Sequence, residues 1–236
     1  MEPRPYRTEP VSFTRRGGRL TERQQGAWDT MSTTYVLEVP RHGTNTSIDP
    51  SYVLDIPATY ARTAPLVLEI GSGRGEALVH AAAAHPELDF LGLEVYVPGV
   101  AQTLVTMRHT GVTNVRLMIV NAAEALSTML PPGSVRELRV WFPDPWHKTR
   151  HHKRRLVTPE FAALAARVLE PGGTWRLATD WEDYAEQIRS VVAASPDFDG
   201  GDWSPRFEGR PQTRFEGKGL DVGRTIRDVA AVRRAP

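Results

Sequence analysis

The 236-residue sequence contains no cysteine, which excludes disulfides, thiolate metal sites and a cysteine nucleophile. It also lacks any uninterrupted apolar run near the roughly 18 residues that a membrane-spanning helix needs. Residues 1–30 hold six arginines and no apolar stretch, so we expect no secretory signal. Apolar residues make up 40% of the chain and charged residues 24%, which is typical of a globular protein with a sizeable core. We therefore expect a cytoplasmic protein without a membrane span.

The formal net charge is only +1, but the charges are unevenly placed along the chain. Residues 147–155 carry five lysines and arginines and no acid, and residues 206–236 carry eight basic and four acidic residues. Residues 1–30 add an excess of two positive charges, so the rest of the chain is acidic. This distribution favours a protein that binds a polyanion on part of its surface. Chance is a plausible explanation for the N-terminal excess but not for the cluster at 147–155.

From Leu66 onward, short apolar runs alternate with longer segments of helical character, which predicts alternating strands and helices. Residues 1–60 are rich in proline, arginine and threonine, so we expect an irregular basic extension with one short helix there, and one domain over residues 61–236. The expected strands are 66–70, 90–95, 115–120, 135–142, 174–178 and 225–232. The expected helices are 22–31, 76–84, 99–109, 122–130, 158–169 and 181–194.

This order predicts a doubly wound α/β fold, in which a mostly parallel sheet is covered by helices on both faces. Ligands of such folds bind beyond the carboxyl ends of the strands. Glycine-rich or polar residues directly follow the expected strands, at Gly71–Gly75, Glu94, Asn121, 143–146 and Asp180. We therefore expect the functional site at this edge of the sheet.

The first expected strand ends in Glu69 and a loop that contains Gly71, Gly73 and Gly75. Alternate glycines permit a tight turn and let a ligand lie against bare main chain. A dinucleotide fingerprint would have its third glycine where Glu76 stands, and two carboxylates beside the loop would repel a pyrophosphate. A ligand with an ammonium group and no phosphate fits better, and S-adenosylmethionine is such a ligand. A glycine-rich turn without a ligand is the alternative.

Two further strand ends suit a nucleoside. Glu94 lies at the end of the second strand, where a carboxylate accepts hydrogen bonds from both ribose hydroxyls in nucleoside-binding folds of this type. Asn121 follows the third strand, where its amide could pair with an adenine edge. Capping the helix that starts at Ala122 is an equally good explanation for Asn121, and both roles are compatible.

The fourth strand runs into an aromatic loop with prolines at 143 and 145 on either side of Asp144. The prolines fix the loop, and the neighbouring Trp and Phe rings offer faces for stacking a base. The basic run 148–155 follows at once, which favours a stacking site beside a phosphate-binding strip. The three histidines in this region could suggest a metal, but five neighbouring cations would oppose a divalent ion. We therefore expect no metal site.

These motifs together resemble the bacterial tRNA (guanine-N7-)-methyltransferases. The similarity lies in residues 69–75, 92–95 with 98–100, 142–148 with 150–155, and 213–216, and it covers about residues 60–232. It implies the seven-stranded class I methyltransferase (Rossmann-like) sheet with an antiparallel C-terminal strand. It also implies transfer of a methyl group from S-adenosylmethionine to N7 of the variable-loop guanosine of tRNA (position 46).

The resemblance also implies roles for individual residues. Asp144 would be catalytic and would contact the methyl donor together with Glu69, Gly71, Gly73, Glu94 and Asn121. The guanosine would be held by Lys148, Asp180, Thr213, Arg214, Phe215 and Glu216. The tRNA would be contacted by Arg150, His151, His152, Lys153, Arg154 and Arg155. No obligate protein partner is expected, and the chain would act as a monomer or homodimer.

Two alternatives stay open at this point. One is an N7-guanine methyltransferase that acts on another RNA, such as ribosomal RNA or a cap guanosine. The other is a non-catalytic RNA-binding protein on the same fold. The three acids Glu69, Glu94 and Asp144 argue against the second alternative, because a protein that binds no methyl donor has no use for them around one pocket.

Overall fold

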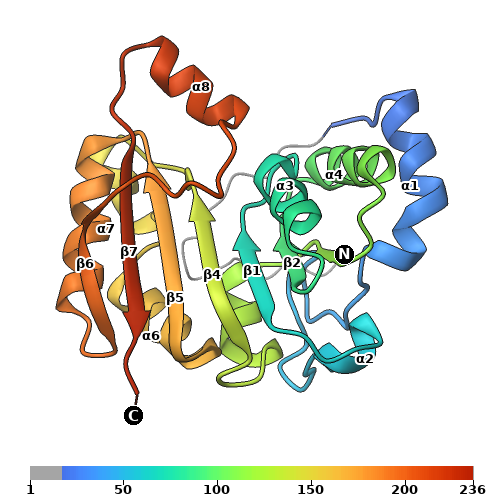
Figure 1. Ribbon diagram of the computed structural model, residues 1–236, viewed down its shortest axis with the longest axis horizontal. Helices are drawn as coiled ribbons and strands as arrows, with labels where there is room; N and C mark the ends of the chain where they lie inside the picture. The colour runs from blue at the N-terminus through green and yellow to red at the C-terminus, as the bar shows by residue number, and fades with distance from the viewer. Residues whose placement is uncertain (1–17, 236) are drawn as a thin grey trace, which may run out of the picture.

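In the computed structural model, which describes residues 18–235, seven strands form one sheet in the order β3-β2-β1-β4-β5-β7-β6 (Figure 1). The first seventeen residues of the expected N-terminal extension lie outside the described residues. The strands are β1 Leu66–Ile70, β2 Asp89–Leu93, β3 Val115–Met118, β4 Val135–Trp141, β5 Leu169–Thr179, β6 Phe198–Ser204 and β7 Arg227–Arg233. The α-helices are α1 Glu22–Tyr35, α2 Ile56–Tyr60, α3 Glu76–Ala84, α4 Val97–Thr110, α5 Ala122–Glu124, α6 Pro159–Val168, α7 Glu182–Ala194 and α8 Arg214–Asp221.

The sheet is mostly parallel. β1 pairs in parallel with β2 and β4, and the parallel pairing continues from β2 to β3 and from β4 to β5. β7 runs antiparallel to both of its neighbours, β5 and β6. The predicted fold class, a doubly wound sheet with an antiparallel C-terminal strand, is therefore confirmed.

β1 shows why these apolar runs form central strands. All five of its residues are buried, and successive side chains of a strand point to opposite faces. Leu66, Leu68 and Ile70 pack in the core that includes α6 and α7, whereas Val67 packs in the core that includes α3 and α4. A strand covered on both faces reads as a continuous apolar run, which is what the sequence has at 66–70.

The predicted helices form, with changes at their ends. α3 has the predicted limits, and α6 begins as expected after Thr158, whose Oγ accepts a hydrogen bond from the Phe161 N–H at 3.2 Å. The helix expected over 122–130 instead consists of α5 and a wider π-helical turn, Ala125–Met129. β5 begins at Leu169 rather than at 174, because Leu169 already pairs with Val135.

Four elements are not expected from the sequence, namely β6, α2, α8 and the 3₁₀ helix Thr149–Arg154. α1 is also longer than expected and packs along α4 at one end of the molecule (Figure 1). The N–H of Leu37 donates to the carbonyl of Leu117 on β3 at 2.8 Å, and Ile48, Leu54 and Tyr60 are buried in the core. The domain boundary at residue 60 stays a prediction.

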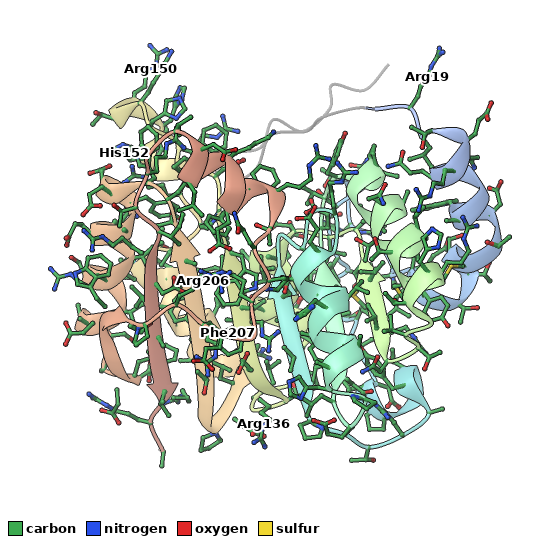
Figure 2. All side chains as sticks on the ribbon, turned by 45° about the horizontal axis from the view of Figure 1, so that its top comes forward. Arg19, Arg136, Arg150, His152, Arg206 and Phe207 are labelled. Carbon is green, nitrogen blue, oxygen red and sulfur yellow. The ribbon has the colours of Figure 1, made fainter. Side chains whose placement is uncertain are left out.

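The segment between β6 and α8 crosses the front of the sheet, as Figures 1 and 2 show at Arg206 and Phe207. The Phe207 ring stacks on Trp141 at the end of β4, with 6.1 Å between ring centroids. The guanidinium of Arg176 also lies over the Phe207 ring, 4.2 Å from its centroid. This crossing places α8 above the carboxyl edge of the sheet. Within residues 18–235, no helix is long and apolar enough to span a membrane.

Candidate active site

A cavity of about 390 Å³ opens at the carboxyl edge of β1, β2 and β4 and is closed on one side by the first turn of α8. Eight of the residues singled out from the sequence line it, although they come from four separate parts of the chain. They are Glu69, Gly71, Gly73, Glu94, Asp144, Thr213, Arg214 and Phe215.

Glu69 is the most deeply buried acid of this cavity. Its residue is only 2% exposed, and its Oε2 atom has no hydrogen-bond partner among the described residues. Burial raises the pKa of Glu69 to about 7, although the charge of the nearby Arg139 and the Trp141 side chain, which can donate a hydrogen bond, act in the opposite direction. A buried carboxylate oxygen without a partner is costly, so the site is built to receive a hydrogen-bond donor.

The glycine loop and Glu94 form the adjoining wall. Gly71 and Gly73 have φ values of 70° and 57°, which L side chains rarely adopt. This turn aims the N–H of Gly73 at Glu94, which accepts it through Oε2 at 2.7 Å, while Oε1 accepts the N–H groups of Val95 and Tyr96. Burial raises the pKa of Glu94, and these backbone hydrogen bonds oppose the rise. The carboxylate is thereby held in a fixed orientation at the cavity wall.

Asn121 lies beside the cavity between two lining residues, Val120 and Ala122. Its Oδ1 accepts the N–H of Ala123 at 3.0 Å, and its Nδ2 donates to Glu124 at 3.2 Å. The side chain therefore caps α5, as one of the two explanations drawn from the sequence requires. Its contact with a donor stays a prediction.

The Asp144 loop, residues 142–146, follows β4. Two bulky residues in it have left-handed backbone conformations, Phe142 with φ 51° and Trp146 with φ 46°. Each such conformation costs about 1–3 kcal/mol and persists only where the surroundings impose it. Asp144 stands exposed between them and lines the cavity. The conformational strain is thus located on the two sides of the predicted catalytic carboxylate.

The basic segment 148–155 forms the 3₁₀ helix Thr149–Arg154 and its flanks. Figure 2 shows Arg150 and His152 at the edge of the molecule where α8 lies. Lys148, Arg150 and Lys153 are exposed, and the Arg154 guanidinium stacks on Trp146 at 3.9 Å from the ring centroid. Four cations of the segment are therefore fully or partly exposed beyond the carboxyl end of β4.

Arg155 differs from its neighbours because its side chain is only 1% exposed. The sequence analysis grouped it with the tRNA contacts, but the structure places its guanidinium inside the protein. His152 is partly buried beside it, with Nε2 3.1 Å from Nη2 of Arg155. His151 packs edge-on against Trp146, with 6.0 Å between ring centroids.

The residues expected around the guanosine occupy two environments. Thr213 caps α8, the backbone N–H of Arg214 donates to Glu76 at 2.7 Å, and Phe215 is 63% exposed at the cavity. Glu216 is instead buried and accepts hydrogen bonds from Arg206 and Arg210. Burial acts to raise the pKa of Glu216, but these two arginines hold it below its usual value. The structure therefore shows the Glu216 carboxylate as an anchor for α8.

Asp180 follows β5 and lies under α8, where its Oδ2 accepts a hydrogen bond from Arg224 at 2.6 Å. The packing is tight, because a Cβ atom at Gly219 of α8 would come within 2.9 Å of the same oxygen. The structure thus brings Asp180 to the same edge of the sheet as Asp144, but in an ion pair.

The sequence analysis did not single out Glu76 as a partner of α8, nor Arg206, Arg210 and Asp228. Arg210 is almost completely buried and makes a two-fold ion pair with Asp228, at 2.5 and 3.0 Å. The only signal in the sequence is the density of arginines and acids after residue 205, which does not reveal the pairing.

The cavity fits S-adenosylmethionine. The unpartnered oxygen of Glu69 can accept the ammonium group as a charge-assisted hydrogen bond, and the fixed carboxylate of Glu94 can accept ribose hydroxyls. Among the described residues there is no group of three or more His, Cys, Asp or Glu side chains able to hold a metal ion.

Comparison with known proteins identifies the family. A family model described as "Putative methyltransferase" matches residues 63–229. A tRNA (guanine-N(7)-)-methyltransferase of Arthrobacter sp. (strain FB24) is 45% identical, over 95% of this chain and 86% of its own length. The protein of the same name from Cutibacterium acnes (strain DSM 16379 / KPA171202) is 48% identical, over 93% of this chain and 81% of its own length. The chain belongs to the tRNA (guanine-N(7)-)-methyltransferase family.

Solved structures agree with this methyltransferase fold. The 16S rRNA methyltransferase KamB superposes with a TM-score of 0.57 at 15% identity, over 78% of this chain and 95% of its own. The 16S rRNA (adenine(1408)-N(1))-methyltransferase of Catenulisporales acidiphilia gives a TM-score of 0.55 at 19% identity, over 84% of this chain and 100% of its own. At such identities the likeness concerns the fold alone.

Proposed function

We propose that this methyltransferase transfers a methyl group from S-adenosylmethionine to N7 of a guanosine in the variable loop of tRNA. The observation that carries the proposal is the cavity that brings Glu69, Glu94 and Asp144 together at one sheet edge. The relatives named tRNA (guanine-N(7)-)-methyltransferase, at 45–48% identity over nearly the whole chain, support the substrate and the atom that is methylated.

The donor is held by Glu69 on β1, the glycine loop between β1 and α3, and Glu94 directly after β2. Glu69 accepts the ammonium group, Gly71 and Gly73 leave room against the main chain, and Glu94 accepts the ribose hydroxyls. When bound, S-adenosylmethionine supplies an electrophilic methyl group on a sulfonium. Asn121 caps α5 next to the cavity through Oδ1, and the second N–H and second lone pair of its amide are left to meet the adenine edge.

Methylation at N7 requires little of the protein beyond the correct placement of the guanine and the methyl donor. Guanine N7 has an in-plane lone pair that is free at neutral pH, so its methylation removes no proton and requires no general base. Catalysis then depends on holding N7 in line with the reacting bond, and such positioning contributes about 7–11 kcal/mol in favourable cases. The role of this chain is to orient the purine and stabilise the charge that the ring acquires.

Asp144 is the residue placed for both tasks. It is exposed at the cavity wall, and a carboxylate beside the ring stabilises the developing positive charge of the purine. Phe215 offers an exposed aromatic face at the same cavity for stacking the base. Asp180 can receive the guanine N1–H and N2–H groups once Arg224 releases it.

The exposed cations of the basic segment hold the tRNA backbone. Arg150, Lys153 and the partly exposed Arg154 contact phosphates, Lys148 holds the guanosine, and the Trp146 ring beneath Arg154 keeps that guanidinium in place. The reaction takes place in the cytoplasm on free tRNA, and the enzyme acts as a monomer or homodimer without an obligate protein partner.

The test is incubation with unmodified tRNA and donor, followed by nucleoside mass spectrometry and mapping of the modified position. We expect 7-methylguanosine in the variable loop and none with Asp144→Ala, while that variant still gains thermal stability from S-adenosylhomocysteine. Methylation of ribosomal RNA or a cap instead of tRNA would support the first alternative, and absence of transfer to any RNA would refute the proposal.

A further inference from the structure

The guanidinium of Arg155 has hydrogen-bond partners that precede the basic segment in sequence and others that follow it. Its Nε donates to the carbonyl oxygen of Pro145 at 2.9 Å, on the Asp144 loop. Its Nη1 donates to Gln187 at 2.7 Å and its Nη2 to Asp183 at 2.5 Å, both on α7. It also lies over the ring of Tyr184, 4.9 Å from the centroid. One planar fork thus ties the Asp144 loop to α7.

The α7 side of this connection is rigid. Tyr184 is buried, and its hydroxyl accepts the N–H of Val157 at 3.0 Å. Gln187 donates to the carbonyl of the same Val157 at 2.9 Å. The residues that grip Arg155 are therefore themselves bonded to the chain that follows it, so the position of the guanidinium is strongly determined.

The Asp144 loop needs such support because both Phe142 and Trp146 have left-handed backbone conformations. Its first residue is covered by a second buried arginine, Arg210, whose guanidinium lies 5.6 Å from the Phe142 ring centroid. Its far end is held by Arg155 at Pro145. Asp144 lies between these two attachments.

We propose that Arg155 is a positioning residue for methyl transfer, which fixes the Asp144 loop on α7 and does not contact the tRNA. The inference rests on the proposed function, because Asp144 must act on the guanosine for its placement to matter. It separates Arg155 from Arg150 and Arg154, which precede it in the same basic segment.

The experiment measures kcat at saturating tRNA, tRNA binding and its dependence on salt for Arg155→Lys and Arg155→Met. We expect kcat to fall about 100-fold in both, since misplacing a reacting group by an ångström has an effect of this order. The Kd for tRNA and the slope of its salt dependence should stay within twofold. Lysine should not rescue kcat, because an ammonium does not reproduce the planar fork, whereas it readily replaces arginine at a phosphate.

A second variant, Asp183→Ala, tests the same connection without removing a buried charge. The side chain of Asp183 is 64% exposed, so Asp183→Ala leaves the core intact but removes one acceptor of Arg155. We expect kcat to fall several-fold. If Arg155 is instead an RNA ligand, freeing it from Asp183 strengthens tRNA binding and leaves kcat unchanged. Arg136→Met, at the opposite edge of the molecule (Figure 2), is the matched control and should behave as wild type.

The outcomes are distinct from those that test the proposed function. If wild type transfers no methyl group to tRNA, the proposed function fails first. If wild type is active but Arg155→Lys keeps kcat, or Arg155→Met weakens tRNA binding and flattens its salt dependence with kcat retained, the positioning role is wrong. If the Arg155 variants do not fold, as judged by loss of stabilisation by S-adenosylhomocysteine, the kcat of Asp183→Ala decides, and an unchanged value overturns the inference.

Discussion

Replacing Glu69 with glutamine removes the charge of the side chain while nearly preserving its shape. Burial raises the pKa of Glu69 from 4.5 to about 7. The folded protein therefore binds more protons than the unfolded chain between about pH 4.5 and 7, so stability falls as pH rises through this range. A shift of this size corresponds to roughly 3 kcal/mol, which wild type loses fully above pH 7 and Glu69→Gln does not lose.

The assay is urea unfolding followed by tryptophan fluorescence at pH 5 and pH 8, with and without S-adenosylhomocysteine. Without ligand, the variant should gain roughly 2.5 kcal/mol relative to wild type on going from pH 5 to pH 8, because the unfolded chain is already largely deprotonated at pH 5. With ligand, it should bind about 10- to 150-fold more weakly, because a hydrogen bond to a charged group contributes about 1.5–3 kcal/mol. Glu87→Gln, at a carboxylate that is 64% exposed, is the control and should follow the wild-type curve. Parallel pH curves for wild type and Glu69→Gln, with equal ligand affinity, would refute the reasoning.

Four other substitutions test the remaining parts of the site. Asp144→Ala should abolish single-turnover methyl transfer while S-adenosylhomocysteine still binds, and transfer at the wild-type rate would contradict its role. Arg150→Ala should lower the slope of log Kd against log salt by about 0.9, and an unchanged slope would show that this arginine makes no phosphate contact. Phe215→Ala should weaken tRNA binding by about 1–3 kcal/mol without affecting the donor, which a titration of both ligands checks. Arg210→Met should destabilise the protein by about 3–5 kcal/mol, since it leaves the carboxylate of Asp228 buried without its partner, and a midpoint within error of wild type in urea would exclude this anchoring role.

The central strands and the glycine loop after β1 could be predicted, because the residues that determine their structure lie within these segments themselves. A strand buried on both faces must be apolar throughout, as Leu66–Ile70 is. The glycines at 71 and 73 mark the tight turn that follows, and both have the positive φ that only glycine adopts easily. Because the carboxyl ends of parallel strands meet at one edge, the sequence alone predicts that Glu69, Glu94 and Asp144 lie together.

Other features depend on contacts that the local sequence does not contain. β6 includes Gly200 and Gly201, and α8 includes Gly217 and Gly219, so neither segment has strong intrinsic propensity. α8 forms where Thr213 caps it, Glu76 receives the N–H of Arg214, and Arg206 with Arg210 holds Glu216. Except for Thr213, each of these partners is distant from α8 in sequence or lies in a segment without a helical or strand-like pattern.

Arg155 shows that, within the basic segment too, the local sequence does not reveal tertiary contacts. A run of cations indicates a polyanion, but it does not reveal which side chains point outward. Asp183 and Gln187, about thirty residues later on α7, turn this one guanidinium inward. Residue type predicted the positive charge of the segment, whereas tertiary packing buries Arg155 and leaves Lys148, Arg150 and Lys153 exposed.

The most direct measurement is a crystal structure with S-adenosylhomocysteine and a guanosine nucleotide. The amino group of the ligand should lie within hydrogen-bond distance of Glu69 Oε2, the ribose hydroxyls against Glu94, and the guanine between Asp144 and Phe215. A ligand bound away from the Glu69 and Asp144 wall, with that cavity still empty, would contradict the central claim.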